Sequence, residues 1–415
     1  MPTAPTRRSL LTAGAGLLAA QALPWRAAAS EPEHDISFVQ DFDELWHTLA
    51  ERYCFFDEKR TDWAAVRARY RPQALAAPSR DAFAAVVDRT LGELYDAHTH
   101  RGDPADGTPR LPYYDLWVEP TDAGGALVTS VRAASAAADA DIVPGDVIAN
   151  VDGAPVAARA AAAMPLCLAR PDPAATAYAL NVAVSGLRAR PRRLALRGAG
   201  GGVRSLLLPV KAPVRLPDVE SRMLPGGYGC IVIRSFADDA VVDAFDAALL
   251  RFQSTAGLVI DVRQNGGGDT AVARPIMGRF IAKQAAYARM RRRDDDHLSD
   301  AWTEVVDPRG PFTYTAPVVV LTTRWSASMA EGFPMGMRGI GRGTIVGTPM
   351  MRLGAAVFPL RLDRSGLDVQ YSAEPVYDTQ GRPRWHLEPD VLVSADQDIL
   401  AAGLRTLDAA RRSAA

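Results

Sequence analysis

The sequence predicts a multidomain α/β protein. Its 415 residues exceed the size of one ordinary domain, and 48% of them are hydrophobic, which is ample for packed cores. Over residues 213–415, short runs rich in Val, Ile and Leu, such as GYGCIVI and GLVIDV, alternate with helical stretches. This alternation is typical of an α/β core, in which strands buried on both faces are apolar throughout.

A helical segment is expected before this core, over residues 30–105. Apolar residues recur there at three- to four-residue spacing, which predicts amphipathic helices. These positions are Phe42, Leu45, Leu49, Tyr53 and Phe56, and then Phe83, Val86, Val87, Leu91 and Leu94.

Residues 110–212 predict a smaller β-rich domain, joined to the helical segment by a Gly-, Pro- and Asp-rich linker. Strand-like runs such as ALVTSV and RRLALRG surround an Ala-rich, helix-like stretch at 156–185. This order suits a PDZ-like domain, whose groove captures an extended peptide as an added strand. A β-rich spacer without a ligand is the alternative.

Residues 1–29 are expected to be a bacterial export signal. Arg7 and Arg8 precede an apolar stretch from Leu10 to Leu23, and three alanines end the segment as a cleavage site. The paired arginines also suit a twin-arginine exporter. A membrane anchor is the alternative, but the apolar run is short for a span. We therefore expect a periplasmic or secreted protein without an integral membrane segment.

The charge balance argues against nucleic acid as a partner. Removing residues 1–29 takes the formal net charge from −1 to −4. The mature chain therefore has no excess of positive charge with which to bind nucleic-acid phosphates. The basic and acidic block at 289–297 is expected to be a solvated loop. The three cysteines lie far apart and lack short-range partners, so we expect no metal site and no cofactor. An oligomer is possible.

Two strand-like runs end in residues suited to acyl transfer. GLVIDV is followed by Gly266, Gly267 and Gly268, where backbone N–H groups can approach a ligand without a Cβ in the way. The run VVVLT is followed by the small residues 326–330 and an expected helix start. A serine at such a turn, with glycine N–H groups nearby, can attack a carbonyl and stabilise the oxyanion.

These segments resemble the carboxyl-terminal processing (tail-specific) serine proteases and their tricorn-like relatives. The resemblance continues in FDELWHTLAERYCFFDEKRTDW, LGELYDAHTH, GDVIANVDG, GRGTIVGTP and HLEPDVLV, which follow the order of the family's motifs. It covers most of the chain after the first thirty residues. It implies a helical N-terminal segment, a PDZ-like domain and an α/β protease core that acts on a peptide or protein substrate.

The resemblance places the nucleophile at Ser328, because the family pattern has a glutamate three residues later, here Glu331. Ser326 is expected to shape the turn and Glu331 to cap the helix. The oxyanion donors are expected to be the N–H of Met329 and that of Gly267 or Gly268. Asp261 and Arg263 are expected to pair with each other and brace the loop.

Many relatives pair the serine with a lysine, but Leu353 stands where that lysine would be. The chain has only Lys59, Lys211 and Lys283, and none lies in a family motif. Histidine is a suitable base near neutral pH, and the tricorn-like motif falls on His98. His100, two residues later, is the second candidate for the base. The expected apparent pKa of the base is near 6 to 7.

The third catalytic member stays open. The tricorn-like branch uses a serine before the histidine, where this chain has Ala97, and a distant glutamate. Asp96 and Glu374 are the possible substitutes. The favoured function is a secreted serine peptidase. Two alternatives are an inactive relative that binds peptides or other ligands on the same scaffold, and an esterase that uses the same groups.

Overall fold

The computed structural model describes residues 38–113, 115–198, 200–212, 214–394 and 397–414. The expected export signal at residues 1–29 lies outside the described residues. Among the helices that the structure describes, none is both long and apolar enough to cross a bilayer.

The N-terminal segment forms three helices, α1 (Val39–Arg52), α2 (Trp63–Leu75) and α3 (Arg80–Gly92). Side chains of Asp62 and Ser79 accept backbone N–H groups at the starts of α2 and α3 and so cap otherwise unpaired donors. The predicted apolar positions of α1 and α3 are buried, which confirms the helical periodicity.

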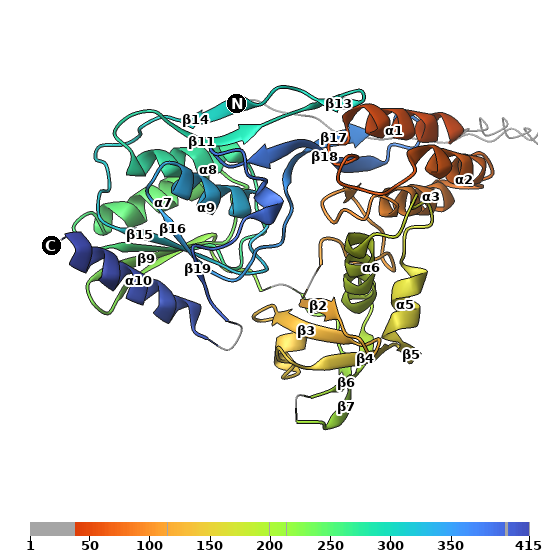
Figure 1. Ribbon diagram of the computed structural model, residues 1–415, viewed down its shortest axis with the longest axis horizontal. Helices are drawn as coiled ribbons and strands as arrows, with labels where there is room; N and C mark the ends of the chain where they lie inside the picture. The colour runs from red at the N-terminus through yellow and green to blue at the C-terminus, as the bar shows by residue number, and fades with distance from the viewer. Residues whose placement is uncertain (1–37, 114, 199, 213, 395–396, 415) are drawn as a thin grey trace, which may run out of the picture. The chain divides into compact units, whose positions relative to one another are not determined.

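These helices share their core with a hairpin from the far end of the sequence (Figure 1). The hairpin consists of β17 (Ala355–Arg361) and β18 (Asp368–Tyr377). β18 also pairs with the short strand β1 (His100–Arg101), and a five-stranded sheet continues through β11 (Ala285–Met290) and β14 (Trp302–Val306). The helical segment therefore depends on strands encoded some 270 residues later.

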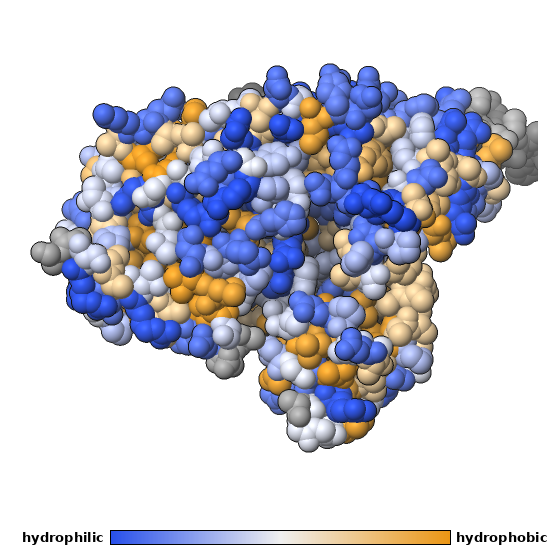
Figure 2. All heavy atoms as spheres, in the orientation of Figure 1, coloured by the Kyte–Doolittle hydropathy of each residue, from blue (hydrophilic) through white to orange (hydrophobic). Residues whose placement is uncertain are grey.

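A second sheet lies within residues 116–208, and all its pairings are antiparallel. Its strands are β2 (Leu116–Pro120), β3 (Ala126–Val131), β4 (Val147–Val151), β5 (Ala154–Pro155), β6 (Arg192–Arg197) and β7 (Val203–Leu208). Its helices are α4 (Ala136–Asp139), α5 (Val156–Ala162) and α6 (Pro173–Ser185). On the face shown in Figure 2, mildly hydrophobic side chains gather over the alanine-rich α5.

The helix-like stretch expected at 156–185 forms two helices. Prolines at 165, 171 and 173 interrupt it, because proline removes a backbone donor and clashes with the preceding turn. The second helix restarts with Pro173 in its first turn, where the missing donor costs nothing, and the Asp172 side chain caps it.

The third sheet is the predicted α/β core, with the strand order β19-β16-β15-β10-β9-β8. Five of its strands are parallel, and β8 joins antiparallel at one edge. The strands are β8 (Val219–Leu224), β9 (Tyr228–Ile233), β10 (Leu258–Asp261), β15 (Val318–Thr322), β16 (Thr344–Gly347) and β19 (Val391–Leu392).

Helices cover both faces of this sheet (Figure 1). Alternate strand residues such as Ile260 and Val320 pack with α7 (Ala240–Arg251), α8 (Thr270–Met277) and α9 (Met329–Gly339). The intervening residues, such as Val259, pack with α10 (Ile399–Ala414). Burial on both faces accounts for the uninterrupted apolar runs and confirms the α/β interpretation.

The block at 289–297 is not simply a solvated loop, so that expectation was wrong. It forms part of a hairpin of β12 (Arg293–Asp294) and β13 (His297–Leu298). Arg293 is only 9% exposed, stacks over Phe56 with its guanidinium carbon 5.4 Å from the ring centre, and pairs with Asp57. Apolar and acidic groups of the N-terminal segment bury this arginine, and nothing local in the sequence indicated them.

Candidate active site

Ser328 occupies a sharp turn between β15 and α9. Its backbone has φ 54° and ψ −117°, a conformation that L-residues rarely adopt and that costs free energy. Nucleophilic serines of other hydrolases occupy comparable strained strand-to-helix turns, which expose the hydroxyl. The carboxylate of Glu331 holds this turn by accepting the N–H of Ser328 at 3.0 Å. Glu331 therefore caps α9, as expected.

The glycine loop after β10 packs directly against this turn. A Cβ on Gly267 would lie 2.8 Å from both the Ser328 Cβ and the Ala327 carbonyl oxygen. A Cβ on Gly268 would lie 2.3 Å from the Phe236 carbonyl carbon. Both glycines also have positive φ, so this close approach requires glycine at each position.

The two glycines differ in the availability of their N–H groups. The N–H of Gly267 donates to the Asn265 side-chain oxygen at 2.7 Å, so it is already used. Within the described chain, the N–H groups of Gly268 and Met329 donate to no other residue. Of the three N–H groups expected as oxyanion donors, the structure therefore disfavours that of Gly267.

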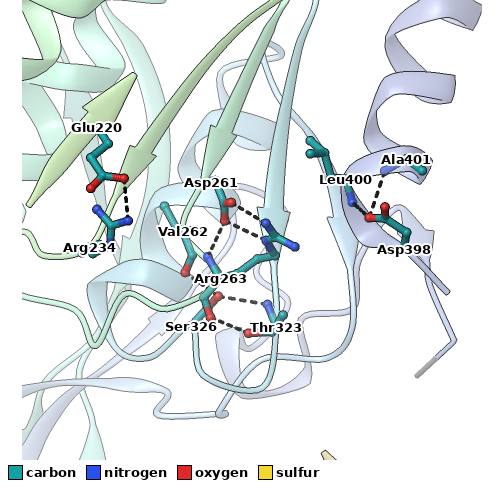
Figure 3. Close-up of polar contacts among 10 residues, drawn as sticks. All are labelled: Glu220, Arg234, Asp261, Val262, Arg263, Thr323, Ser326, Asp398, Leu400 and Ala401. Carbon is teal, nitrogen blue, oxygen red and sulfur yellow. Dashed lines mark hydrogen bonds and ion pairs between the residues drawn. The ribbon is translucent and has the colours of Figure 1, made fainter. Parts of the chain in front are cut away.

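Ser326 is fully buried and its hydroxyl is occupied, as Figure 3 shows. The hydroxyl donates to the Val262 carbonyl at 2.8 Å and accepts the Thr323 N–H at 3.1 Å, which ties the loops after β10 and β15 together. In the same view, Asp261 and Arg263 form the expected pair, with a shortest distance of 2.7 Å. These groups brace the turn that carries Ser328.

His98 lies between α3 and β1 and is 6% exposed. Its carbonyl oxygen accepts the side-chain N–H of Gln370, which fixes this loop to β18. Its Nδ1 is buried without a partner, and within the described residues the imidazole forms no hydrogen bond. His100 differs, because its Nδ1 contacts the Arg101 carbonyl and its Nε2 the Gln370 amide.

Burial lowers the pKa of His98 to about 4. The nearby Asp96 opposes this effect, whereas the positive charge of Arg384 adds to it. A neutral imidazole can accept a proton and a charged one cannot, so the base form should be lost as pH falls through about 4.

This shift gives a testable pH profile. We expect kcat/KM to rise with pH through an apparent pKa of about 4 and to be level at pH 6 to 7, instead of rising there as the sequence suggested. The measurement is peptide hydrolysis under kcat/KM conditions from pH 3.5 to 8, with stability checked at each pH. An acidic limb centred near 6.5 would contradict the burial of a neutral His98.

Neither carboxylate proposed as the third member contacts the imidazole. Asp96 accepts the backbone N–H of His98 at 2.9 Å and hydroxyl groups of Thr99 and Ser372. Glu374 lies on β18 and accepts the Arg292 guanidinium, with its Nε at 2.8 Å. Asp96 therefore holds the backbone of the His98 loop, whereas Glu374 is committed to an ion pair.

Lys59 is a neighbour of this loop that sequence reasoning missed. Its Nζ donates to the Tyr95 carbonyl at 3.2 Å and lies 4.2 Å from the centre of the Tyr95 ring. Burial alone would raise the pKa of Asp96, but the charges of Lys59 and His98 and several hydrogen bonds hold it below its usual value. Lys59 precedes Asp96 by 37 positions in the sequence, so no local spacing linked them.

Leu353 occupies the position where many relatives have a lysine. Its buried side chain belongs to the same packed cluster as Ala97, which precedes His98, and Ala327, which precedes Ser328. Its N–H donates to Glu331 at 2.8 Å. The cluster thus brings together the segments that carry the candidate base and nucleophile, with an apolar side chain in place of a lysine.

A cavity of about 350 Å³ adjoins the candidate nucleophile. Ser328, Met329 and Gly268 line it, together with residues 355–357 of β17 and the side chain of Arg384. His98 is not among the lining residues. The structure therefore gathers the candidate nucleophile and two candidate oxyanion donors at one cavity, whereas the buried imidazole does not line it.

Glu331 is expected to be important for stability, because one buried carboxylate oxygen accepts the N–H groups of both Ser328 and Leu353. Glu331→Ala leaves these donors unpaired and should lower the free energy of unfolding by roughly 3 kcal/mol. Glu331→Gln keeps an accepting oxygen and should lose less. Urea denaturation measures both, with the exposed Glu388→Ala as a control. Equal stability of the Ala and Gln variants would contradict this role.

Two family models match parts of this chain. Residues 227–393 match the model of Peptidase family S41, and residues 36–92 match that of the Tricorn protease C1 domain. Residues 227–393 thus form a Peptidase family S41 domain. The matched regions contain both candidate catalytic loops of the core and the helices that precede the His98 loop.

Individual proteins are also similar to this chain. The tail-specific protease of Haemophilus influenzae is 28% identical over 217 residues, which cover 48% of this chain and 30% of that protein. The chain thus spans about a third of the length of this relative. Among solved structures, mature CPAF in complex with lactacystin has a TM-score of 0.60 at 18% identity, covering 91% of this chain and 98% of that one.

A photosystem II D1 C-terminal processing protease has a TM-score of 0.57 at 21% identity, covering 89% of this chain and 97% of that one. At these identities the likeness concerns the fold. It extends from the helical segment to the α/β core, and so confirms the multidomain α/β class.

Proposed function

We propose that this chain is a serine peptidase in which Ser328 is the nucleophile and His98 the base. The observation that carries the proposal is the strained Ser328 turn, which borders a cavity next to the free N–H groups of Met329 and Gly268. Strain of this kind persists where the surrounding structure enforces it, and it is frequent at active sites. The match of residues 227–393 to Peptidase family S41 supports the same reaction class.

In the proposed reaction, Ser328 Oγ attacks the carbonyl carbon of the scissile bond while His98 accepts the hydroxyl proton. The carbonyl oxygen becomes an oxyanion, which the N–H groups of Met329 and Gly268 stabilise. His98 then gives the proton to the departing amine, and an acyl-enzyme remains. Water then attacks the acyl-enzyme carbonyl while His98 accepts a proton from it. The intermediate expels Ser328 Oγ, which regains the proton from His98, and the acid product leaves.

The imidazole must approach Ser328 for this proton transfer, because the two are not hydrogen-bonded in the described structure. Catalytic hydrogen bonds often tighten only when substrate is bound. Asp96 would act through the backbone of the His98 loop and through its negative charge, which favours the imidazolium that forms during attack.

The cavity also suits an extended peptide. Residues 355–357 of β17 line it, and among the described strands β17 pairs only with β18, so no described strand occupies its other edge. A substrate strand could add to that edge and place its carbonyl near Ser328. The sheet of β2 to β7 is proposed to be the PDZ-like peptide-binding module.

A fluorophosphonate probe tests the proposal, because it labels only activated serines. We expect labelling of the mature chain at Ser328, established by peptide mapping, together with hydrolysis of peptide substrates. Turnover of esters without peptides would instead identify an esterase. Binding of peptides without labelling would identify an inactive relative, and would overturn the proposed catalysis.

Export to the periplasm or the exterior is part of the proposal, on the strength of residues 1–29. The mass of the protein recovered from a periplasmic extract tests it, since cleavage after Ala29 removes a defined segment. An uncleaved chain confined to the cytoplasm would contradict export.

A further inference from the structure

Arg384 places a buried positive charge beside the candidate nucleophile. It lies in a short 3-10 turn (Arg384–His386) after β18, and its side chain is only 5% exposed. Nη2 donates to the carbonyl oxygens of Leu353 at 2.6 Å and Ala355 at 3.0 Å. The same side chain lines the cavity that contains Ser328.

The guanidinium is incompletely satisfied. Its Nε is buried without a partner, and no carboxylate in the described residues lies within ion-pair distance of it. Glu331 is the acid that acts on it electrostatically, but one oxygen of Glu331 already accepts the N–H groups of Ser328 and Leu353. Arginine keeps its proton in proteins, so the charge remains.

A buried charge without a carboxylate at ion-pair distance is costly, and it marks a place where an anion gains free energy by binding. The other residues that line the cavity are mostly apolar, and one is acidic. Tyr287, Met290, Val357 and Val376 offer apolar surface, and Asp269 is an exposed carboxylate that caps α8. Water screens an exposed carboxylate more than it screens a buried guanidinium.

We propose that Arg384 forms an anion subsite that binds a substrate carboxylate close to the scissile bond. This inference rests on the proposed peptidase function and specifies its substrate class. The planar guanidinium fits a carboxylate, and the apolar wall accommodates the carbon chain that carries it. The carboxylate comes either from an acidic side chain or from the free C-terminus of a substrate cleaved near its end.

The wild-type enzyme provides the first test, with two matched pairs of peptides. One pair has Glu or Gln next to the scissile bond, and the other has a free or an amidated C-terminus close to it. We expect kcat/KM to favour the carboxylate by about tenfold or more in one pair, as for a charge-assisted hydrogen bond. The pair that responds identifies the source of the carboxylate.

Equal turnover within both pairs by an enzyme that the fluorophosphonate labels would overturn the subsite and leave the peptidase function intact. Absence of labelling and turnover would instead overturn the proposed function. The two failures are thus distinguishable without any variant, which matters because Arg384 also bonds two backbone carbonyls.

Variants provide the second test. Arg384→Gln should bring the selectivity ratio of the responding pair close to one, and Arg384→Lys should keep part of the preference because it keeps the charge. The exposed Arg364 serves as the control, and Arg364→Gln should leave the ratio unchanged. A labelled Arg384→Gln enzyme with the wild-type ratio would overturn the proposal.

Discussion

Replacing Ser328 with alanine is expected to reduce kcat for peptide hydrolysis by at least about 10⁴-fold, since loss of a nucleophile removes the covalent route. The fold should survive, because the backbone N–H of Ser328 bonds to Glu331 and alanine keeps this bond. The measurement is single-substrate turnover, with circular dichroism as a check of folding. Fluorophosphonate labelling should disappear in the same variant.

Ser326→Ala is the matched control. It removes a buried hydroxyl that joins Val262 to Thr323, and should lower stability by about 1–3 kcal/mol. Its folded fraction should retain most of the wild-type kcat, because that hydroxyl is committed to structure. Full activity in Ser328→Ala would refute the mechanism, and equal loss in both variants would leave the nucleophile unassigned.

His98→Ala should cost several orders of magnitude in kcat, comparable to the loss of the serine, because nucleophile and base act as a unit. The unpartnered Nδ1 and the absence of any imidazole hydrogen bond in the described structure leave this ring free to take a proton. Steady-state kinetics on peptide substrates measures the loss, and slow labelling by fluorophosphonate should accompany it.

His100→Ala is the control for the base, and should cost far less. Both ring nitrogens of His100 are occupied by Arg101 and Gln370, so it cannot readily accept a proton from Ser328. Leu353→Lys should not rescue His98→Ala, because the Leu353 side chain is enclosed in an apolar cluster that disfavours a charged amine. An inactive His100→Ala with an active His98→Ala would place the base two residues later.

The helices and strands of the core were predictable because burial selects apolar residues at regular spacing within each element. The strand runs around Ile260 and Val320 are apolar throughout, and the helical spacing of Phe42, Leu45 and Leu49 identifies one buried face. The turn at Ser328 and the glycines facing it were also readable, because few residue types fit such backbone.

The electrostatics of the site were not predictable from the sequence. The pKa of His98 depends on how deeply its ring is buried and on Arg384, which follows it by 286 positions. Gly267 could not be separated from Gly268 as a donor, because the difference is that the Gly267 N–H donates to the Asn265 side-chain oxygen. The ion pair of Glu374 likewise depends on a tertiary contact.

The pairing of β1 with β18 has a consequence for when the protein can become active. The loop that bears His98 is held by Gln370, so this part of the site forms only after the chain has been synthesised beyond that residue. A nascent chain that ends shortly after α9 would contain Ser328 but would lack the strand that fixes the base. Contacts so distant in sequence also form late in folding. If His98 is the base, as proposed, the order of synthesis would delay proteolysis until the chain is nearly complete.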